Sequence, residues 1–367
     1  MASTRRTIPR WLSERRTAYL PEAPSMPLHI AVLQDRFRAA VLGFAIGDAL
    51  GFPLRGLPAP ALSRQTLPAD DFAARPRGGF PRGQFSDDTQ MMMAVADAVV
   101  REKRIDGRVA AQHLSWLWQE GTVLQPPPSA TQSAEKLLAG TPWMSAGAPL
   151  GVTDPSSLSR GVVVGLSSEP MPTRLAHDAQ VLTVMTHKDP LCAAAVAAFA
   201  RAVQLGLSGE GMTAEEFCEQ ISHAAAPHSR ELADELFYLP RALEWDADRA
   251  LLALRRVGVP PTHYDFELGV PAHVTPVLLT GLYAFLKAPT DFRAAMQLVL
   301  RGGGEVDVTA GVCGAVAGAH LGSEAIPQRL RKNVMYAEAL VEVADRLFDV
   351  KLARVPVVTS AFATVKR

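Results

Sequence analysis

Apolar residues recur at helical spacing along most of this 367-residue chain. The first such pattern covers residues 28–37 and leads into the small-residue run AAVLGFAIGDALG at 39–51. Alternation of apolar and polar residues is confined to 161–166 and 354–359, which predict two short strands. Many helices and few strands indicate a compact, multi-helix, all-α domain. Further buried helices are predicted over Thr89 to Val100, Leu191 to Leu207, Pro276 to Leu286, Phe292 to Leu300, Gly311 to Leu321 and Tyr336 to Phe348.

The organisation along the chain follows from where this helical pattern starts and stops. Residues 1–28 hold five arginines and four prolines with little apolar periodicity, and predict an arm outside the core. The arm is either a loosely docked tail or a contact for a protein partner, and both alternatives remain open. Residues 29–350 form the predicted domain, and 351–367 a C-terminal tail. Two long loops are predicted inside the domain, at 57–85 and 125–157, and loops of that length are often functional.

Composition narrows the class of protein. Apolar residues make up 48% of the chain, enough for a sizeable core. Lys plus Arg and Asp plus Glu are both 37, and a net charge of zero makes nucleic acid an unlikely partner. The three cysteines, Cys192, Cys218 and Cys313, are too far apart in sequence for a CxxC module and suggest a reducing compartment. No uninterrupted apolar run reaches the ~20 residues that span a bilayer, and the N-terminus lacks an apolar signal region. We therefore expect a cytoplasmic protein that does not enter membranes.

A cluster of oxygen donors precedes one predicted helix. Ser86, Asp87 and Asp88 stand directly before the helix that starts near Thr89. Adjacent carboxylates flanked by hydroxyls are the ligands that Mg²⁺ and Mn²⁺ prefer. The alternative is an ordinary helix start, in which Ser86 caps the helix and the acids favour its dipole.

A second acidic cluster precedes another apolar helix. Gly303 and Gly304 end a run of three glycines, and Glu305 and Asp307 follow with one residue between them. The glycines allow a sharp turn and a close approach of the backbone to a ligand, and the two acids are placed to enter one pocket. A glycine loop with a capping Asp is the alternative explanation.

Two further motifs carry polar residues in apolar surroundings. Asp48 lies within the apolar run 43–51, where a carboxylate must be hydrogen-bonded, paired or near a metal to be tolerated. His187, in the segment 186–190 before a predicted helix, is a candidate for binding a polar substrate. A capping turn is the alternative for His187.

Taken together, these motifs resemble those of the ADP-ribosylglycohydrolase family over residues 35–348. The family pattern contains a GDALG start, an [S/T]DDT helix start, a THxxP segment, a GGDTDTxA segment and a later Ile-Pro. The corresponding segments here are GFAIGDALG at 43–51, SDDT at 86–89, THKDP at 186–190, GGEVDVTAGVCGA at 303–315 and Ile-Pro at 326–327.

The resemblance implies a metal-dependent hydrolase that cleaves the glycosidic bond of ADP-ribose, or a related ribosyl group, in a modified protein or small molecule. It implies one or two Mg²⁺ ions, or Mn²⁺, in the site. One of Asp87 and Asp88 is the expected general base. Asp48 is expected to be a structural partner. The implied metal ligands are Ser86, Asp87 and Asp88 for one ion, and Glu305 and Asp307 for the other; the implied substrate contacts are His187, Arg55, Gly303 and Gly304.

The sequence departs from the family pattern at three positions that bear on activity. Glu305 replaces an Asp and keeps a carboxylate. Val308 replaces a Thr that supplies a ligand oxygen, and only Thr309 offers a nearby substitute. Arg55 stands where many family members have Glu. A cation there either repels a metal ion or binds a phosphate.

These departures keep two other functions open. One is a catalytically impaired family member that binds ADP-ribose, a nucleotide or a protein partner. The other is a hydrolase of a different small riboside. The segment 154–165 also departs from the family's pocket-lining motif, of which it retains Arg160.

Overall fold

The computed structural model describes residues 30–64, 67, 69–74, 76–209, 211–260 and 268–354. The predicted N-terminal arm, residues 355–359 of the second predicted strand and most of the predicted C-terminal tail lie outside the described residues. The predicted all-α fold is confirmed, since 70% of the structure is helical and the described residues form no strand. Two isolated β-bridges, Ala148 with His187 and Val270 with Gly304, are the extended pairings found among them.

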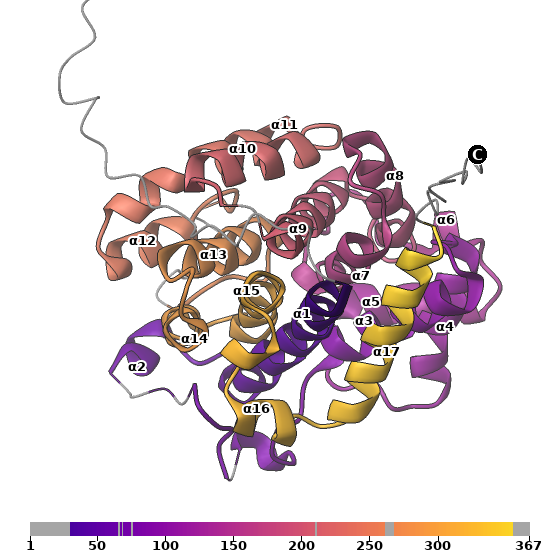
Figure 1. The fold of residues 1–367 in the computed structure, drawn as a ribbon. Helices are drawn as coiled ribbons and strands as arrows, with labels where there is room; N and C mark the ends of the chain where they lie inside the picture. The colour runs from indigo at the N-terminus through magenta and orange to yellow at the C-terminus, as the bar shows by residue number, and fades with distance from the viewer. Residues whose placement is uncertain are drawn as a thin grey trace, which may run out of the picture.

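Seventeen α-helices and several short 3₁₀ helices make up the fold (Figure 1). The α-helices are α1 (Ile30–Gly51), α2 (Ala59–Ser63), α3 (Asp87–Glu102), α4 (Gly107–Gln119), α5 (Pro128–Leu138), α6 (Trp143–Ala146), α7 (Ser159–Ser167), α8 (Pro172–Thr183), α9 (Pro190–Ser208), α10 (Ala214–Ala225), α11 (Arg230–Tyr238), α12 (Ala247–Leu254), α13 (Val274–Lys287), α14 (Phe292–Leu300), α15 (Val306–Leu321), α16 (Gln328–Asn333) and α17 (Ala337–Leu352). The 3₁₀ helices are η2 (Phe52–Leu54), η3 (Arg77–Gly79), η4 (Pro155–Ser157), η5 (Leu239–Glu244) and η7 (Ser323–Ala325).

Helices α1 and α15 run side by side through the middle of the molecule, and glycines bring their backbones together (Figure 1). A Cβ added at Gly43 would lie 2.0 Å from the carbonyl oxygen of Gly314, and one at Gly47 would lie 2.1 Å from that of Ala310. At Gly51 it would lie 2.4 Å from the Cα of Asp307. Larger residues at these positions would therefore force the helices apart. The close approach brings the end of α1 against the start of α15.

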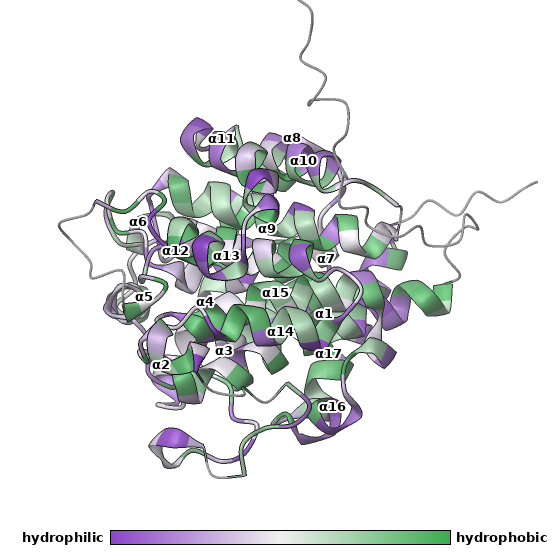
Figure 2. Cartoon of the chain, turned by 90° about the vertical axis from the view of Figure 1, so that its left-hand side faces the viewer, coloured by the Kyte–Doolittle hydropathy of each residue, from purple (hydrophilic) through white to green (hydrophobic). Residues whose placement is uncertain are grey.

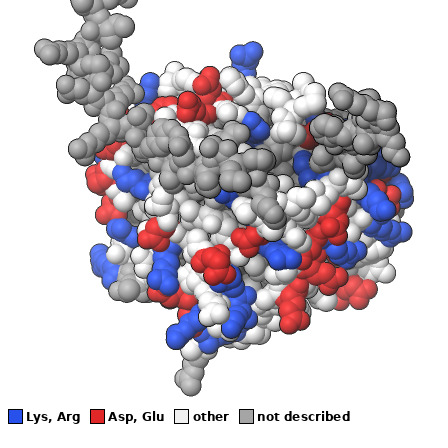
Figure 3. Space-filling model, viewed as in Figure 1, with Lys and Arg blue, Asp and Glu red and all other residues white. Residues whose placement is uncertain are grey.

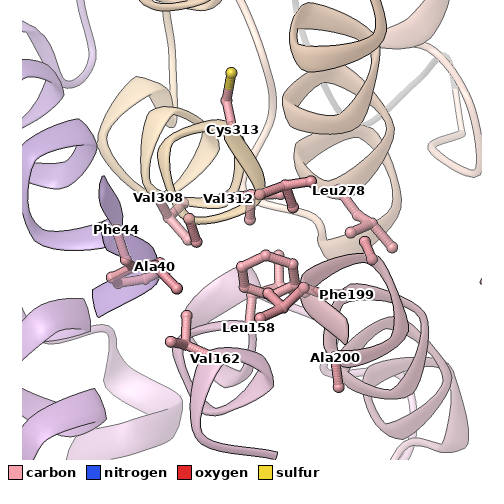
Figure 4. Close-up of a cluster of buried hydrophobic side chains, with 14 of the residues drawn as sticks. Ala40, Phe44, Leu158, Val162, Phe199, Ala200, Leu278, Val308, Val312 and Cys313 are labelled. Atoms are coloured by element: carbon pink, nitrogen blue, oxygen red, sulfur yellow. The ribbon is translucent and has the colours of Figure 1, made fainter. Parts of the chain in front are cut away.

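The hydrophobic core lies around this helix pair. In Figure 2 the central helices α1 and α15 are largely hydrophobic, whereas α11 shows many hydrophilic residues. Figure 4 shows one part of the core, where side chains from five helices meet. They are Ala40 and Phe44 of α1, Leu158 just before α7 and Val162 in it, Phe199 and Ala200 of α9, Leu278 of α13, and Val308, Val312 and Cys313 of α15.

Most predicted helices are found within a few residues of their expected limits. The prediction of a strand at 161–166 is wrong, because these residues lie inside α7 and are buried all round. A short buried apolar run has no periodicity that separates strand from helix. The predicted loop at 125–157 contains α5, α6 and η4. The proline run there precedes and opens α5, since Pro128 is its first residue and proline is favoured at that position.

The surface carries mixed charge, as the balanced composition predicts. On the face shown in Figure 3, Lys and Arg are interspersed with Asp and Glu. The segments Ile30–Leu54 and Pro190–Ser208 are long and apolar enough to cross a membrane by length and composition. However, 83% of the most apolar 18-residue stretch of the first and 78% of that of the second is buried inside the protein, as in the core helices of a globular domain.

Candidate active site

The start of α3 is anchored by a buried carboxylate from α1. Asp48 accepts hydrogen bonds from the backbone N–H of Ser86 at 3.0 Å and of Thr89 at 3.2 Å. It also accepts one from the Thr89 hydroxyl at 2.6 Å. The Ser86 hydroxyl caps the helix by accepting from the N–H of Asp88. Burial, and next the charge of Asp307, raise the pKa of Asp48 to about 6 against these hydrogen bonds. Asp48 thus fixes the position of the segment 86–89 at the start of α3.

The two acids that open α3 are buried, and three of their oxygens have no hydrogen-bond partner. These are Oδ1 and Oδ2 of Asp87 and Oδ1 of Asp88. Burial raises the pKa of both carboxyls well above the usual range, and for Asp87 the nearby Arg55 opposes that shift. Buried carboxylate oxygens without a donor are costly unless a cation or proton satisfies them. The start of α3 is therefore built to receive a positive group.

The start of α15 is shaped by the two glycines that precede it. Gly303 and Gly304 both have positive φ values, 64° and 67°. The N–H of Gly304 donates to the carbonyl of Leu57, and the carbonyl of Gly304 accepts from the N–H of Gly56. A Cβ at Gly304 would lie 2.1 Å from the carbonyl oxygen of Val270. The close approach is thus to the protein's own backbone, and contact of either glycine with a substrate stays a prediction.

The acids of α15 differ in their surroundings from those of α3. Asp307 is fully buried, and Oδ2 lies 3.0 Å from Nη1 of Arg55. Burial and the charge of Asp307 raise the pKa of Glu305 to about 7. The Thr309 hydroxyl donates to the carbonyl of Glu305, one turn back along its own helix. Val308 points among the apolar side chains of the core (Figure 4). Neither Val308 nor Thr309 supplies a free oxygen to the acidic cluster.

Arg55 lies between the two helix starts. Its Nη1 lies 3.0 Å from Asp307 and 3.6 Å from Oδ1 of Asp87. Its Nη2 donates to the carbonyl and the side-chain oxygen of Gln125. The guanidinium also lies 5.2 Å from the centre of the Phe52 ring. Although burial opposes the charge, Asp307 and Asp87 raise the pKa of Arg55 above its ordinary value. Arg55 is therefore charged and held from several sides.

The loop before α5 holds Arg55 from a further side, through Gln125. Gln125 has a φ of 52°, a conformation that residues other than glycine rarely adopt. Gln90 of α3 holds this loop through bonds to the carbonyl of Thr122 and the N–H of Leu124. Leu124 also accepts a hydrogen bond from the N–H of Asp87. The loop that fixes Arg55 is thus tied to the start of α3.

His187 lies inside the protein and holds a further carboxylate. Its ring is 1% exposed, with Nε2 3.0 Å from Oδ2 of Asp154 and Nδ1 3.0 Å from the Thr186 hydroxyl. Although burial raises the pKa of Asp154, the hydrogen bond and charge of His187 lower it below the usual range. Asp189 caps α9 through the N–H of Leu191, as the capping alternative predicts. Both ring nitrogens have partners here, and a substrate contact for His187 stays a prediction.

Sequence reasoning missed several residues at this site. Asp154 is absent from the candidate set, although its charge contributes to the raised pKa of Glu305. Gln125 lies in a predicted loop and belongs to none of the sequence motifs. Arg160 is fully buried and donates to the carbonyl of Ser156. Burial lowers the pKa of Arg160 to about 10, against the charge of Asp88.

The two halves of the cluster differ in how well they fit a divalent ion. No three His, Cys, Asp or Glu side chains among the described residues converge as a metal site of protein ligands alone would require. The start of α3 offers two carboxylates with unpartnered oxygens and a hydroxyl, which suits a Mg²⁺ ion that keeps several waters. At the start of α15, Arg55 pairs with Asp307, and Val308 contributes no oxygen. The oxygens of Asp307 also lack a hydrogen-bond partner, but the guanidinium of Arg55 already stands 3.0 Å from one of them. One ion therefore fits beside α3, and Arg55 stands where a second ion at α15 would bind.

The fold and this buried acidic cluster define a class of protein. The sequence profile of the ADP-ribosylglycohydrolase family matches residues 30–355. The chain therefore belongs to the ADP-ribosylglycohydrolase family, as the sequence motifs predict, and is a divergent member of it.

Individual relatives agree with this assignment. The chain is 25% identical over 351 residues to the ADP-ribosylarginine hydrolase Tri1 of Pseudomonas putida, covering 93% of this chain and 83% of Tri1. It is 24% identical over 343 residues to the ADP-ribosylhydrolase ARH3 of Danio rerio, and the match covers 87% of this chain and 91% of ARH3. An uncharacterised protein of Archaeoglobus fulgidus is 25% identical over 321 residues, covering 87% and 98%.

A solved structure supports the fold. It is described as an ADP-ribosylglycohydrolase-related protein complex and superposes with a TM-score of 0.68 at 23% identity. The match covers 88% of this chain and 99% of that one. Membership of this family is consistent with hydrolysis of ADP-ribose linkages.

Proposed function

We propose that this protein hydrolyses the bond between C1 of an ADP-ribosyl ribose and its carrier, with one divalent ion bound beside α3. The observation that carries the proposal is the set of three buried oxygens of Asp87 and Asp88 that accept no hydrogen bond. Nη1 of Arg55 lies near both Asp87 and Asp307, so two helix starts supply acids to one place. Such an acidic cluster suits a reaction whose transition state carries positive charge on a sugar ring.

Ser86, Asp87 and Asp88 would hold the ion, and Mg²⁺ or Mn²⁺ suits their oxygen atoms. When bound, the ion supplies a positive charge that orients hydroxyls of the ribose and acidifies a water. The partial positive charge at the N-terminus of α3 would favour the anionic diphosphate of the substrate.

The reaction consumes one water and leaves the protein unchanged. The bond from C1 to the carrier atom breaks, and its electron pair stays with the carrier. The water oxygen bonds to C1. One of Asp87 and Asp88 accepts the proton that this water loses, and a proton is returned to the carrier atom. Burial raises the pKa of both carboxyls, which makes each a stronger proton acceptor than an exposed Asp.

Release of free ADP-ribose tests this proposal. A panel of substrates ADP-ribosylated on different side chains and small molecules is incubated with the protein, in Mg²⁺ and in chelator. Asp87→Asn is the test variant, and Asp106→Asn, which changes the ordinary cap of α4, is its matched control. We expect release in Mg²⁺ that chelator and Asp87→Asn abolish and Asp106→Asn preserves. No release from any substrate by the folded protein would contradict the proposal.

A second candidate function is binding of ADP-ribose without turnover. The ion pair between Arg55 and Asp307 favours it, because a permanent cation occupies acids that the family uses for metal. Calorimetric titration with free ADP-ribose separates the two functions. Binding together with complete absence of release would support the second candidate.

A further inference from the structure

The guanidinium of Arg55 occupies a place between the two acidic helix starts where a cation is needed. It contacts Asp307 at 3.0 Å and lies 3.6 Å from Asp87. We propose that Arg55 takes the place of a second divalent ion, so that the site binds one ion beside α3 and carries its other cation within the chain. This inference rests on the proposed function, since it concerns the same pocket.

Arg55 is held as a fixed part of the site. Its side chain is 21% exposed, and Nη2 lies 3.0 Å from Oε1 and 3.3 Å from the carbonyl oxygen of Gln125. The Phe52 ring packs below the guanidinium. The backbone next to Arg55 is also fixed, because the N–H of Gly56 donates to the carbonyl of Gly304 at 3.0 Å. The same short turn therefore positions Arg55 and the start of α15.

The start of α15 offers a second ion two carboxylates and no hydroxyl, and Arg55 stands against one of them. Val308 points into the core, and the Thr309 hydroxyl is committed to the carbonyl of Glu305. That leaves Glu305 and Asp307, of which Asp307 already has a cationic partner. The two changes act in the same direction: the absence of a hydroxyl ligand at position 308 weakens the site for a second ion, and Arg55 supplies positive charge in its place.

A guanidinium differs from a divalent ion in ways that matter for function. It carries one positive charge, presents donors in a fixed plane and does not exchange with solution. The charge at this point therefore does not depend on the ion concentration. Binding of the remaining ion is expected to follow a single-site curve.

The number of Mn²⁺ ions bound per chain tests the inference. Calorimetric and electron paramagnetic resonance titrations with Mn²⁺ alone are made on the full chain. We expect one ion on the wild type and none on Asp87→Asn. Arg55→Gln frees Asp307 and is expected to raise the number to two. Arg55→Lys keeps the charge and should stay at one. Arg104→Gln, which removes a cation paired with Asp106 at the far end of α3, is the matched control and should also stay at one.

Each outcome decides the inference. Two ions on the wild type would overturn it and leave the proposed hydrolase intact. One ion on a folded Arg55→Gln, with folding verified by circular dichroism, would also overturn it. No ion on the wild type but one on Arg55→Gln would sustain the role of Arg55 and contradict the ion beside α3. No ion on either would overturn both.

Discussion

Helices α3 and α15 both begin with a pair of acids, yet the two starts are built differently. At α3, Ser86 caps the helix and Asp48 accepts three hydrogen bonds from the motif. Three oxygens of its own acids accept no hydrogen bond, and only one of the three, Oδ1 of Asp87, lies near Arg55, at 3.6 Å. At α15, Glu305 provides no side-chain cap, and Asp307 is paired with Arg55. One start is prepared for a cation from solution, and the other has a cation from the chain.

The difference between the two helix starts shows how the protein stabilises a buried cluster of carboxylates. Several carboxylates in one interior repel each other and lose their hydration. The protein offsets that cost with Arg55 between the two starts and Arg160 buried beside Asp88. Fixed cations stabilise the fold before any ion binds. The same carboxylates at α3 remain available for chemistry.

The largest expected effect comes from removing one acid at each start. Asp87→Asn replaces the carboxylate that would hold the ion and accept a proton by a neutral amide, and should lower the rate of ADP-ribose release by at least about 100-fold. Asp307→Asn should cost less activity, because Arg55 remains in the pocket. Rates of release by both variants, with thermal melts to verify folding, make the comparison. Equal losses would argue against different roles for the two starts.

A second effect concerns stability at the start of α3. Asp48→Ala leaves buried donors at Ser86 and Thr89 without an acceptor and should lower the free energy of unfolding by about 3 kcal/mol. Asp106→Ala removes an exposed cap of α4 and should cost about 1 kcal/mol. Urea denaturation measures both. If Asp48→Ala lowers the free energy of unfolding no more than Asp106→Ala does, Asp48 contributes no more than an ordinary helix cap.

A third effect concerns the pH dependence of stability at His320, which lies in the last turn of α15, away from both acidic helix starts. Burial, and next the charge of Arg36, lower the pKa of His320 to about 4 from an ordinary 6.5. The unfolded chain therefore binds a proton that the folded chain excludes, and stability falls as pH decreases from 6.5 towards 4. His320 should account for a loss of about 2 kcal/mol between pH 7 and pH 5. Unfolding of His320→Gln should show a correspondingly weaker pH dependence, and an unchanged dependence would exclude His320 as its source.

The smallest expected effect is at Val308. Val308→Thr places a hydroxyl among the apolar side chains around Phe44 and Phe199 and should destabilise the protein by about 1 kcal/mol (Figure 4). The number of bound Mn²⁺ ions should stay unchanged. A gain of an ion in this variant would mean that position 308 faces the acidic cluster.

The helical pattern and the two acidic motifs could be predicted from sequence because each is local. Capping by Ser86 and the small residues of α1 follow from short stretches of the chain. The segment 161–166 could not be assigned, because a buried helix and a buried strand show the same continuous apolar run. Likewise, Pro128 opens α5, although a run of prolines also indicates a loop.

The candidate site was harder to predict because its contacts join distant segments. The pairing of Arg55 with Asp307 depends on the turn that hydrogen-bonds Gly56 to Gly304. The pairing of His187 with Asp154 joins residues 33 positions apart. Charge alone left two roles open for Arg55, and only the fold places it between the carboxylates.

The most direct test of this account is the position of bound ions in a crystal grown with Mn²⁺, located by anomalous scattering. The account predicts one peak beside Asp87 and Asp88, with Arg55 still paired to Asp307. A peak between Glu305 and Asp307, with Arg55 displaced from the pocket, would contradict it.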